Sequence, residues 1–308
     1  MRVLVTGGAG FIGSHIVDRY VDMGYDVHIV DNLTSGKTSH INNKATLHEI
    51  DICSDSFGKL LTEIKPDAVN HHAAQASVKI SVLDPKHDLL VNGSGTANVA
   101  LLSAMHGVKH LIYASSGGTL YGQPLKNPVH ENAEIKPLSP YGVSKFAGEE
   151  YVKFVARSSE MNTTIFRYGN VFGPRQDPSG EAGVIAIFAG NLLTGKPCII
   201  DGDGEQVKDY IYVSDIADIN TLVLEEDSSK VNETFNIGTG TGTSVKTIYR
   251  TLREQIGSDI TPSYGPPRIG DVRRIFLDCS FVKRQIGWQV KKTFSEGIEN
   301  TIAALKNP

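Results

Sequence analysis

A glycine-rich turn near the N-terminus constrains the fold of this chain more than any other feature of the sequence. Residues 6–13 read TGGAGFIG, directly after a short apolar stretch and directly before a helical pattern over 12–23. In such a turn Gly7 permits a sharp change of direction, Gly10 lets the backbone approach a pyrophosphate, and Gly13 lets the helix pack closely on the strand. The N–H groups and the dipole of that helix then face the anion. The turn therefore predicts a β-strand, a phosphate-binding loop and an α-helix in succession.

The end of the second predicted strand indicates which dinucleotide the loop binds. The apolar stretch Val27–Val30 leads to Asp31, which lies 18 residues after Gly13. A carboxylate at this point accepts a hydrogen bond from a ribose hydroxyl and repels a 2′-phosphate. Asn32 follows it, where an arginine would favour the phosphate. The sequence therefore predicts a site that prefers NAD to NADP.

The rest of the first half continues to alternate strand and helix patterns. We expect further strands at 68–70, 111–114 and 164–166, and helices at 94–105 and 140–157. Alternating strands and helices form a parallel sheet with helices on both faces. The predicted fold class is therefore α/β, with a Rossmann-type doubly wound parallel sheet whose ligands bind at the carboxyl ends of the strands.

After about Asn170 the chain becomes rich in turns, and its strands and helices no longer alternate. This change predicts a smaller α+β lobe that binds the substrate. Strand patterns at 210–213 and 235–238 bracket a helical pattern at 215–224, as in the first half. We therefore expect an NAD-binding domain of residues 1–169 plus about 214–240, interleaved with a substrate lobe of residues 170–213 and 241–308.

Composition excludes several classes of function. The 30 Lys+Arg and 34 Asp+Glu give a net charge of −4, which argues against a nucleic-acid or anionic-membrane partner. Cys53, Cys198 and Cys279 lie far apart and form no metal-binding motif, so we expect reduced thiols and no metal. The longest apolar run, 184–193, is too short to span a membrane, and the first residues carry no targeting pattern. We therefore expect a cytoplasmic protein.

The segment Tyr141-Gly142-Val143-Ser144-Lys145 is the second informative feature. Tyr141 and Lys145 lie four residues apart, so on a helix that starts near Pro140 they share one face. A free tyrosine has a pKa of about 10. A neighbouring ammonium and a cationic nicotinamide favour the phenolate and lower that pKa. We therefore expect Tyr141 to act as an acid and base and Lys145 to hold the cofactor ribose.

A predicted strand end supplies hydroxyl groups for the same site. The strand at 111–114 runs into Ser115-Ser116-Gly117-Gly118-Thr119, and such an end faces the ligand crevice of a doubly wound sheet. A hydroxyl there can bond the substrate oxygen that Tyr141 contacts. His71 and His72 also end a strand, but adjacent strand residues point to opposite faces and cannot easily share a metal ion.

Seven motifs together resemble the extended short-chain dehydrogenase/reductase family, and within it the shorter UDP-glucose 4-epimerases. The resemblance covers nearly the whole chain and rests on TGGAGFIG at 6–13, Asp31, HHAAQ at 71–75, SSGGTLYG at 115–122, YGVSK at 141–145, RYGN at 167–170 and VKDYIYV at 207–213. The resemblance implies a bound NAD, a UDP-sugar substrate and a homodimer. Its four-helix interface would use the helices at 94–105 and 140–157 of each subunit.

The resemblance also implies roles for individual residues. The catalytic set is Ser116, Tyr141 and Lys145. The cofactor contacts are Gly7, Gly10, Phe11, Ile12, Gly13, Asp31, Asn32, Asp51, Ile52, Ala73, Ala74, Gln75, Asn92, Tyr141, Lys145 and Tyr168. The substrate contacts are Ser116, Thr119, Tyr141, Asn170, Val184, Ile200 beside the uracil, Lys208, Arg268, Asp271 and Ile275.

Departures from the family pattern leave some roles open. Ser115 or Thr119 could share the role of Ser116, and Lys208 replaces an arginine that commonly binds the diphosphate. Ile275 stands where relatives carry a large aromatic or a small residue, so it could set the choice of sugar.

The implied activity is C4 epimerisation of UDP-glucose and UDP-galactose through transient oxidation to a 4-keto sugar. Epimerisation of UDP-GlcNAc or UDP-glucuronate is the alternative. A dehydratase or decarboxylase is disfavoured because Gly117-Gly118 replaces the acidic residues that those enzymes place after the hydroxyl residue. A non-catalytic NAD-binding sensor would not need the intact Tyr141–Lys145 pair.

Overall fold

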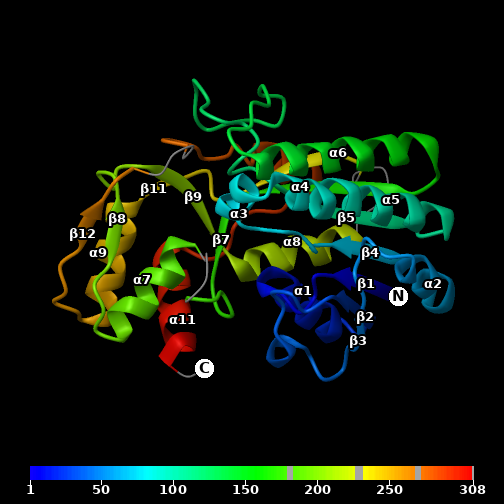
Figure 1. The fold of residues 1–308 in the computed structure, drawn as a ribbon, viewed down its shortest axis with the longest axis horizontal. Helices are drawn as coiled ribbons and strands as arrows, with labels where there is room; N and C mark the ends of the chain where they lie inside the picture. Colours follow the sequence, from blue (N-terminus) through cyan, green and yellow to red (C-terminus); the bar gives the residue numbers. More distant parts are fainter. Residues whose placement is uncertain (179–182, 226–231, 268–271, 307–308) are drawn as a thin grey trace.

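The computed structural model describes residues 1–178, 183–225, 232–267 and 272–306 (Figure 1). A seven-stranded sheet forms its centre, in the order β10-β6-β5-β4-β1-β2-β3, and each pairing within it is parallel. The predicted Rossmann-type fold class is therefore confirmed. The strands are β1 (Arg2–Thr6), β2 (Asp26–Asp31), β3 (Thr46–Glu49), β4 (Ala68–His71), β5 (His110–Ser116), β6 (Asn162–Tyr168) and β10 (Thr234–Ile237).

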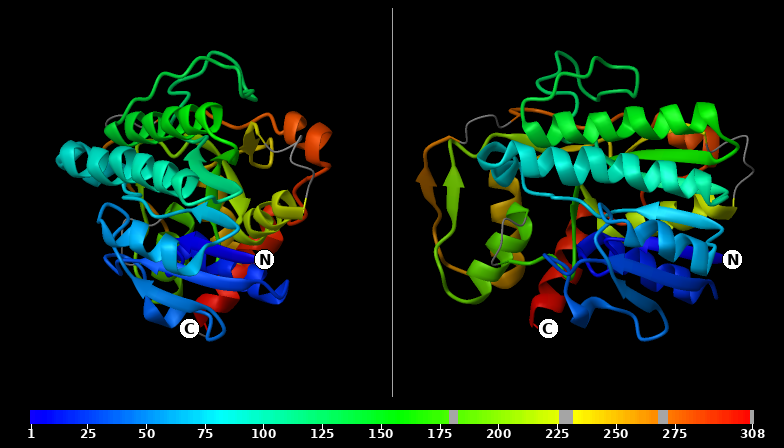
Figure 2. Two further views of the ribbon diagram at one scale, coloured as in Figure 1. Left: turned by 90° about the vertical axis from the view of Figure 1, so that its right-hand side faces the viewer. Right: turned by 45° about the vertical axis from the view of Figure 1, so that its right-hand side comes forward.

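Helices cover both faces of this sheet, as Figures 1 and 2 show. On one face α1 (Phe11–Asp22) and α8 (Val213–Glu225) pack against the sheet in one apolar cluster. On the other face α2 (Ser56–Ile64), α5 (Thr96–Met105) and α6 (Pro140–Ser158) form a second cluster. Each buried strand therefore carries apolar side chains on both sides, which is typical of parallel sheets.

The helix expected at 94–105 begins differently from the prediction. Two short helices, α3 (Val78–Leu83) and α4 (Pro85–Asp88), precede a π-helical segment at Leu89–Gly95, and α5 continues from Thr96. π-helical turns are rare and often lie at functional sites.

The remaining elements form a lobe at one end of the sheet, seen at the left of Figure 1. In this lobe β7 (Asn170–Phe172), β9 (Val207–Tyr212) and β11 (Gly242–Ser244) form one sheet, and β8 (Ile199–Asp201) pairs with β12 (Ser263–Gly265). Helices α7 (Val184–Leu193), α9 (Val245–Ile256) and α11 (Phe294–Lys306) enclose a third apolar cluster. The exception is α10 (Ser280–Ile286), which packs near β10 of the central sheet and contributes to the first apolar cluster.

The chain passes between sheet and lobe at several points. β6 ends at Tyr168 in the central sheet and β7 starts at Asn170 in the lobe sheet, so the carboxyl end of β6 faces the lobe. Later α8 packs on α1 and β10 joins β6. The domain division expected from the sequence remains a prediction. Among the described residues, no helix combines the length and apolar character that a membrane span requires.

Candidate active site

The strand order of the sheet reverses between β1 and β4, and ligands of doubly wound sheets bind beside that switch point. The glycine loop follows β1 there. Gly7 has φ +71°, and a Cβ on it would lie 2.6 Å from the Ala73 backbone nitrogen, so this turn requires glycine. A Cβ on Gly13 would overlap the carbonyl oxygen of Gly7. Both glycines therefore fulfil the packing roles expected of them.

Gly10 leaves room at the N-terminus of α1. A Cβ on Gly10 would meet only the Gly7 carbonyl oxygen, at 3.1 Å. No side chain caps this helix, and its first turn has no acidic residue. The N–H groups at the start of α1 therefore receive no capping side chain, and Gly10 places no Cβ beside them. This arrangement fits a pyrophosphate.

Asp31 connects the end of β2 to the glycine loop. Its Oδ2 accepts a hydrogen bond from the Ala9 N–H at 3.0 Å, and its Oδ1 accepts one from the Leu33 N–H at 2.9 Å. Each carboxylate oxygen has a second lone pair that can accept a hydroxyl. Asn32 donates to Asp51 at 3.1 Å, so these residues lie along one edge of the site. The buried Ile52 follows Asp51 directly.

The two histidines at the end of β4 point in different directions. His71 is bonded through its two ring nitrogens to the hydroxyls of Thr6 and Thr96, at 2.7 and 3.0 Å. His72 instead lies 3.3 Å from the hydroxyl of Tyr168. Burial, with the nearby Lys145 charge, lowers the pKa of His72 to about 3. In the part of the chain that the structure describes, no three potential ligands gather around a metal position.

Beyond the histidines, the loop after β4 is fixed by a reciprocal pair of hydrogen bonds. The Gln75 N–H donates to Asn92 Oδ1 and Asn92 Nδ2 donates to the Gln75 carbonyl, both at 2.9 Å. Ala73 donates its N–H to the Thr6 hydroxyl at 3.2 Å, and Ala74 lies between these anchored positions.

Helix α6 brings Tyr141 and Lys145 to the same region. Ser139 caps the helix by accepting a hydrogen bond from the Gly142 N–H at 3.2 Å, and Pro140 occupies its first position. Lys145 is 3% exposed, and its Nζ lies 4.6 Å from the centre of the Tyr113 ring. Burial lowers the pKa of Lys145 to about 8, although the carboxylates of Glu149 and Asp88 act in the opposite direction.

The Tyr141 phenol differs from the sequence-based expectation. Its pKa is raised to about 12, mainly by burial and also by the Asp88 carboxylate, while a hydrogen bond with Ser116 acts in the opposite direction. Lys145 is not among the groups that influence this pKa, so the expected depression by its charge is not found in the chain alone, where desolvation disfavours the phenolate. A phenolate near neutral pH requires additional positive charge beside Tyr141.

The structure separates the two serines at the end of β5. Ser115 is 4% exposed and donates to Glu149 Oε1 at 2.6 Å, so its hydroxyl belongs to a buried network. Ser116 is partly exposed, bonds Tyr141 and accepts a hydrogen bond from the Thr119 hydroxyl at 2.8 Å. This geometry favours Ser116 over Ser115 as the hydroxyl beside Tyr141, with Thr119 orienting it.

The residues expected to contact the substrate differ in exposure and in hydrogen bonding. Asn170 begins β7 and is partly exposed; its Oδ1 would lie 2.9 Å from a Cβ on Gly118. Val184 begins α7 and is partly exposed. Lys208 on β9 donates through Nζ to the Val272 carbonyl at 2.6 Å. Arg268 and Asp271 lie outside the described residues.

Two of the expected substrate contacts have buried side chains. Ile200 is 1% exposed within the apolar cluster of the lobe. Ile275 is also 1% exposed, in a cluster with Tyr121, Val129, Val272 and Leu277. Their burial means that a contact from either position requires a local rearrangement or is made by the backbone.

Tyr168, an expected cofactor contact, is 5% exposed, and its hydroxyl accepts a hydrogen bond from Asn220 at 2.8 Å.

Two buried acidic residues near the site were not predicted from the sequence. Glu149 is fully buried and forms an ion pair with Arg167 at 2.7 Å. Its spacing of four residues from Lys145 places it on the same helical face, which was a usable signal. Asp88, also fully buried, ends the short helix α4 and had no such periodic signal.

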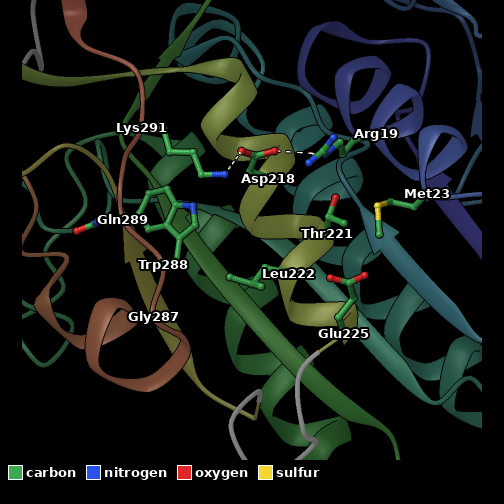
Figure 3. Close-up of a pocket in the computed structure, with 10 residues that line it drawn as sticks. All are labelled: Arg19, Met23, Asp218, Thr221, Leu222, Glu225, Gly287, Trp288, Gln289 and Lys291. Atoms are coloured by element: carbon green, nitrogen blue, oxygen red, sulfur yellow. Dashed lines mark hydrogen bonds and ion pairs between the residues drawn. The ribbon is translucent and has the colours of Figure 1, made fainter.

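A cavity of about 380 Å³ lies away from these residues, between α1, α8 and residues 287–291 (Figure 3). Arg19 and Lys291 both point at Asp218 there, with contacts of 3.3 and 2.8 Å. None of the residues expected in the site lines this cavity. The two cations of this cavity both pair with Asp218.

Comparison with known proteins identifies the family of the chain. The family described as "NAD dependent epimerase/dehydratase family" matches residues 3–238. The UDP-glucose 4-epimerase of Mycolicibacterium smegmatis is 39% identical over 312 residues, covering 100% of this chain and 99% of that protein.

Two solved structures are also similar to the chain. The UDP-glucose 4-epimerase of Thermotoga maritima, determined with UDP-glucose, is 44% identical, with a TM-score of 0.97 and 99% of each chain covered. The Thermus thermophilus UDP-glucose 4-epimerase, determined with NAD, is 39% identical, with a TM-score of 0.93 and coverage of 100% of this chain and 99% of that one.

Proposed function

The chain belongs to the NAD-dependent epimerase/dehydratase family, and we propose that it interconverts UDP-glucose and UDP-galactose by epimerisation at C4. One observation carries this proposal: Ser116, at the end of β5, bonds the Tyr141 phenol, with Lys145 one turn further along α6. These groups can move a proton at a sugar hydroxyl. The glycine loop follows β1 of the same sheet, and its Gly7 lies close to Ala73, just after β4.

NAD supplies a hydride acceptor and donor when it is bound. The residues that would hold it are the first turn of α1 with the glycine loop, Asp31, and the linked pair Gln75 and Asn92. Asn32, Asp51, Ile52, Ala73, Ala74 and Tyr168 would complete this site. The missing side chain at Gly10 and the uncapped α1 terminus support the placement of the pyrophosphate.

The chain's own groups would handle the proton. Tyr141 would accept the proton of the sugar 4-hydroxyl and later return it, while Ser116 donates a hydrogen bond to the same oxygen. Lys145 would hold the cofactor ribose, and its ammonium would stabilise the Tyr141 phenolate. General acid–base groups of this kind contribute about 10²–10⁴-fold to rates.

The glycines after Ser116 support epimerisation over elimination of water. A Cβ on Gly117 would lie 2.6 Å from Leu277 Cδ1 and 2.9 Å from the Arg167 carbonyl oxygen. An acidic side chain therefore has no room at residue 117 without movement of its neighbours.

The substrate would be contacted by Thr119, Asn170, Val184, Ile200, Lys208, Arg268, Asp271 and Ile275.

An exposed apolar surface supports a homodimer. Leu101 and Met105 on α5 are 42% and 78% exposed, and Val143, Tyr151 and Phe154 on α6 are 55%, 48% and 53% exposed. Large apolar patches commonly mark interaction sites. These two helices, side by side in Figures 1 and 2, would form a four-helix interface with a second copy. The unpaired cysteines fit a cytoplasmic location.

An NMR assay without added NAD tests the function. Purified protein is incubated separately with UDP-glucose, UDP-GlcNAc and UDP-glucuronate, and the sugar resonances are followed. We expect UDP-galactose to form from UDP-glucose. Conversion of another sugar alone would replace the proposed substrate, and loss of water or carbon dioxide would replace the proposed reaction. No conversion, even after NAD is supplied, would contradict the function.

A further inference from the structure

We propose that Asp88 is a positioning residue of this site, whose buried carboxylate holds three segments together and places a fixed negative charge beside Tyr141 and Lys145. The inference rests on the proposed function, because it assigns Asp88 a part in the same proton transfer. It does not depend on which sugar is the substrate.

Three side chains from three different segments donate to Asp88, which is fully buried. Gln75 Nε2, in the loop after β4, donates to Oδ1 at 2.7 Å. Asn92 Nδ2, in the π-helical segment, donates to the same oxygen at 3.0 Å. Ser144 Oγ, on α6, donates to Oδ2 at 2.6 Å. A carboxylate is acceptor-only, so this set of donors suits it.

Each of these donors lies next to a group with a proposed role. Ser144 stands between Tyr141 and Lys145 in the sequence, and its hydroxyl also lies 3.0 Å from the Tyr141 carbonyl oxygen. Gln75 and Asn92 hold the loop proposed to contact NAD. One carboxylate therefore fixes the position of α6 relative to the loop proposed to contact NAD. The proposed hydride and proton transfers need these two segments to be held in one arrangement.

The local backbone is built to place this acid. Asp84 caps α4 by accepting a hydrogen bond from the His87 N–H at 3.0 Å, and Pro85 starts the helix. Asp88 ends it, and the π-helical segment begins at Leu89. The wider turn carries Asn92 back onto the carboxylate of Asp88.

The charge of Asp88 acts on both functional groups of α6. It favours the Lys145 ammonium and disfavours the Tyr141 phenolate. The other titratable groups around this centre are Tyr113 on β5, Glu149 on α6, and His71 and His72 at the end of β4. Lys86 and His87, on α4 itself, are exposed. Asp88 therefore helps keep a buried lysine charged, at the cost of a less acidic tyrosine.

The variant Asp88→Asn tests the charge separately from the hydrogen bonds. Its amide oxygen can accept from Gln75 and Asn92, and its NH₂ can donate to Ser144, which still has the Tyr141 carbonyl as an acceptor. The matched control is Asp84→Asn, which removes an exposed carboxylate four residues earlier but keeps an amide oxygen that can cap α4. If Asp88→Asn does not fold, Asp88→Ser removes the same charge with a smaller side chain and is measured in its place.

The decisive measurement is the pH dependence of kcat and of kcat/KM. Removing the negative charge lowers the pKa of Tyr141 and of Lys145, so both limbs of the profile should move to lower pH, by about one unit. Asp84→Asn should leave both limbs in place. A merely structural role would reduce activity at every pH without moving the limbs, and that result would overturn the proposal.

A second readout separates this proposal from the proposed function. Tyrosinate absorbance is titrated in the wild type and in Asp88→Asn, each compared with the same background carrying Tyr141→Phe. The difference reports the ionisation of Tyr141 and needs no turnover. If no sugar is converted but Tyr141 ionises at lower pH in Asp88→Asn, the electrostatic role stands and the function fails. An unchanged Tyr141 titration contradicts the role of Asp88 whatever the substrate.

Discussion

The buried ion pair behind the site allows a prediction about stability. Glu149 is fully buried and Arg167 is 3% exposed. Arg167 donates through Nε to Glu149 Oε1 at 2.9 Å and through Nη2 to Oε2 at 2.7 Å. Its Nη1 donates to the Tyr121 hydroxyl and the Glu131 carbonyl, both at 2.9 Å. Burial alone would lower the pKa of Arg167, but the Glu149 carboxylate outweighs it and raises that pKa.

The substitution Glu149→Gln keeps the shape of the side chain and removes its charge. Arg167 then stays buried without a counter-charge. The NH₂ group of the new glutamine also faces an N–H donor of Arg167, and because NH₂ is itself a donor, that hydrogen bond is lost. Breaking a buried pair by removing one partner costs about 3–5 kcal/mol. For 308 residues at about 2.1 cal/mol/K each, this loss lowers Tm by about 5–8 °C.

Thermal unfolding followed by circular dichroism measures this loss. The matched control is Glu150→Gln, because Glu150 is the neighbouring residue, is exposed, and pairs only with Lys153 among the contacts described, at 2.9 Å. An exposed pair is worth about 0–1 kcal/mol, so Glu150→Gln should lower Tm by less than about 2 °C. Equal shifts in the two variants would refute the argument. The double variant Glu149→Gln/Arg167→Met should recover part of the loss, since it removes the unpaired charge.

Two further predictions concern the proposed catalytic and cofactor residues. Tyr141→Phe should lose about 10²–10⁴-fold in kcat while still binding UDP-sugar, and Ser116→Ala should lose less, because the base remains. Ser115→Ala should lower Tm, because Ser115 bonds Glu149, and should lower kcat less than Ser116→Ala does. A larger loss of kcat at Ser115 than at Ser116 would reverse their assignment. Nucleotide released from denatured protein should be NAD, and Asp31→Ala should relax the preference over NADP. NADP as the main species would contradict the reasoning on Asp31.

The regular part of the fold was predictable because each buried strand and each long helix leaves a local pattern. The strand patterns that led to β1, β2, β4, β5, β6 and β10 are short apolar runs, and the helix patterns repeat with a helical period. β3 was not predicted. Its sequence Thr-Leu-His-Glu is polar because it lies at the edge of the sheet with partly exposed side chains. Pairing with β2, a non-local contact, makes this segment a strand.

The site was predictable where one segment supplies several of its groups. The glycine loop and the Tyr141–Lys145 spacing are local patterns, so both could be read from the sequence. Asp88 could not, because its partners Gln75, Asn92 and Ser144 come from three segments that only the folded sheet brings together. The pKa of Tyr141 was misjudged for a related reason. Spacing indicates which charges are near, but desolvation depends on everything packed around the phenol.

Ile275 is the position at which sequence and structure suggest different roles. The resemblance predicts that it sets the choice of sugar, and its intermediate size predicts better activity on UDP-glucose and UDP-galactose than on the N-acetylated pair. In the structure its side chain is 1% exposed, and its N–H donates to the Val207 carbonyl at 3.0 Å. The backbone is thus fixed beside β9, and a change of side chain must be absorbed by the surrounding cluster.

The ratio of kcat/KM for the two sugar pairs separates these roles. As a gate, Ile275→Ser should move the ratio toward the N-acetylated sugars and Ile275→Tyr away from them, each by about 10–200-fold, the range for one small group in an apolar pocket. As core alone, both variants should lower Tm and leave the ratio unchanged. Ile275→Val is the control, since it costs about 0.5–1.5 kcal/mol and barely alters the side-chain volume. We expect opposite shifts from Ser and Tyr; equal ratios in all four proteins would restrict Ile275 to packing.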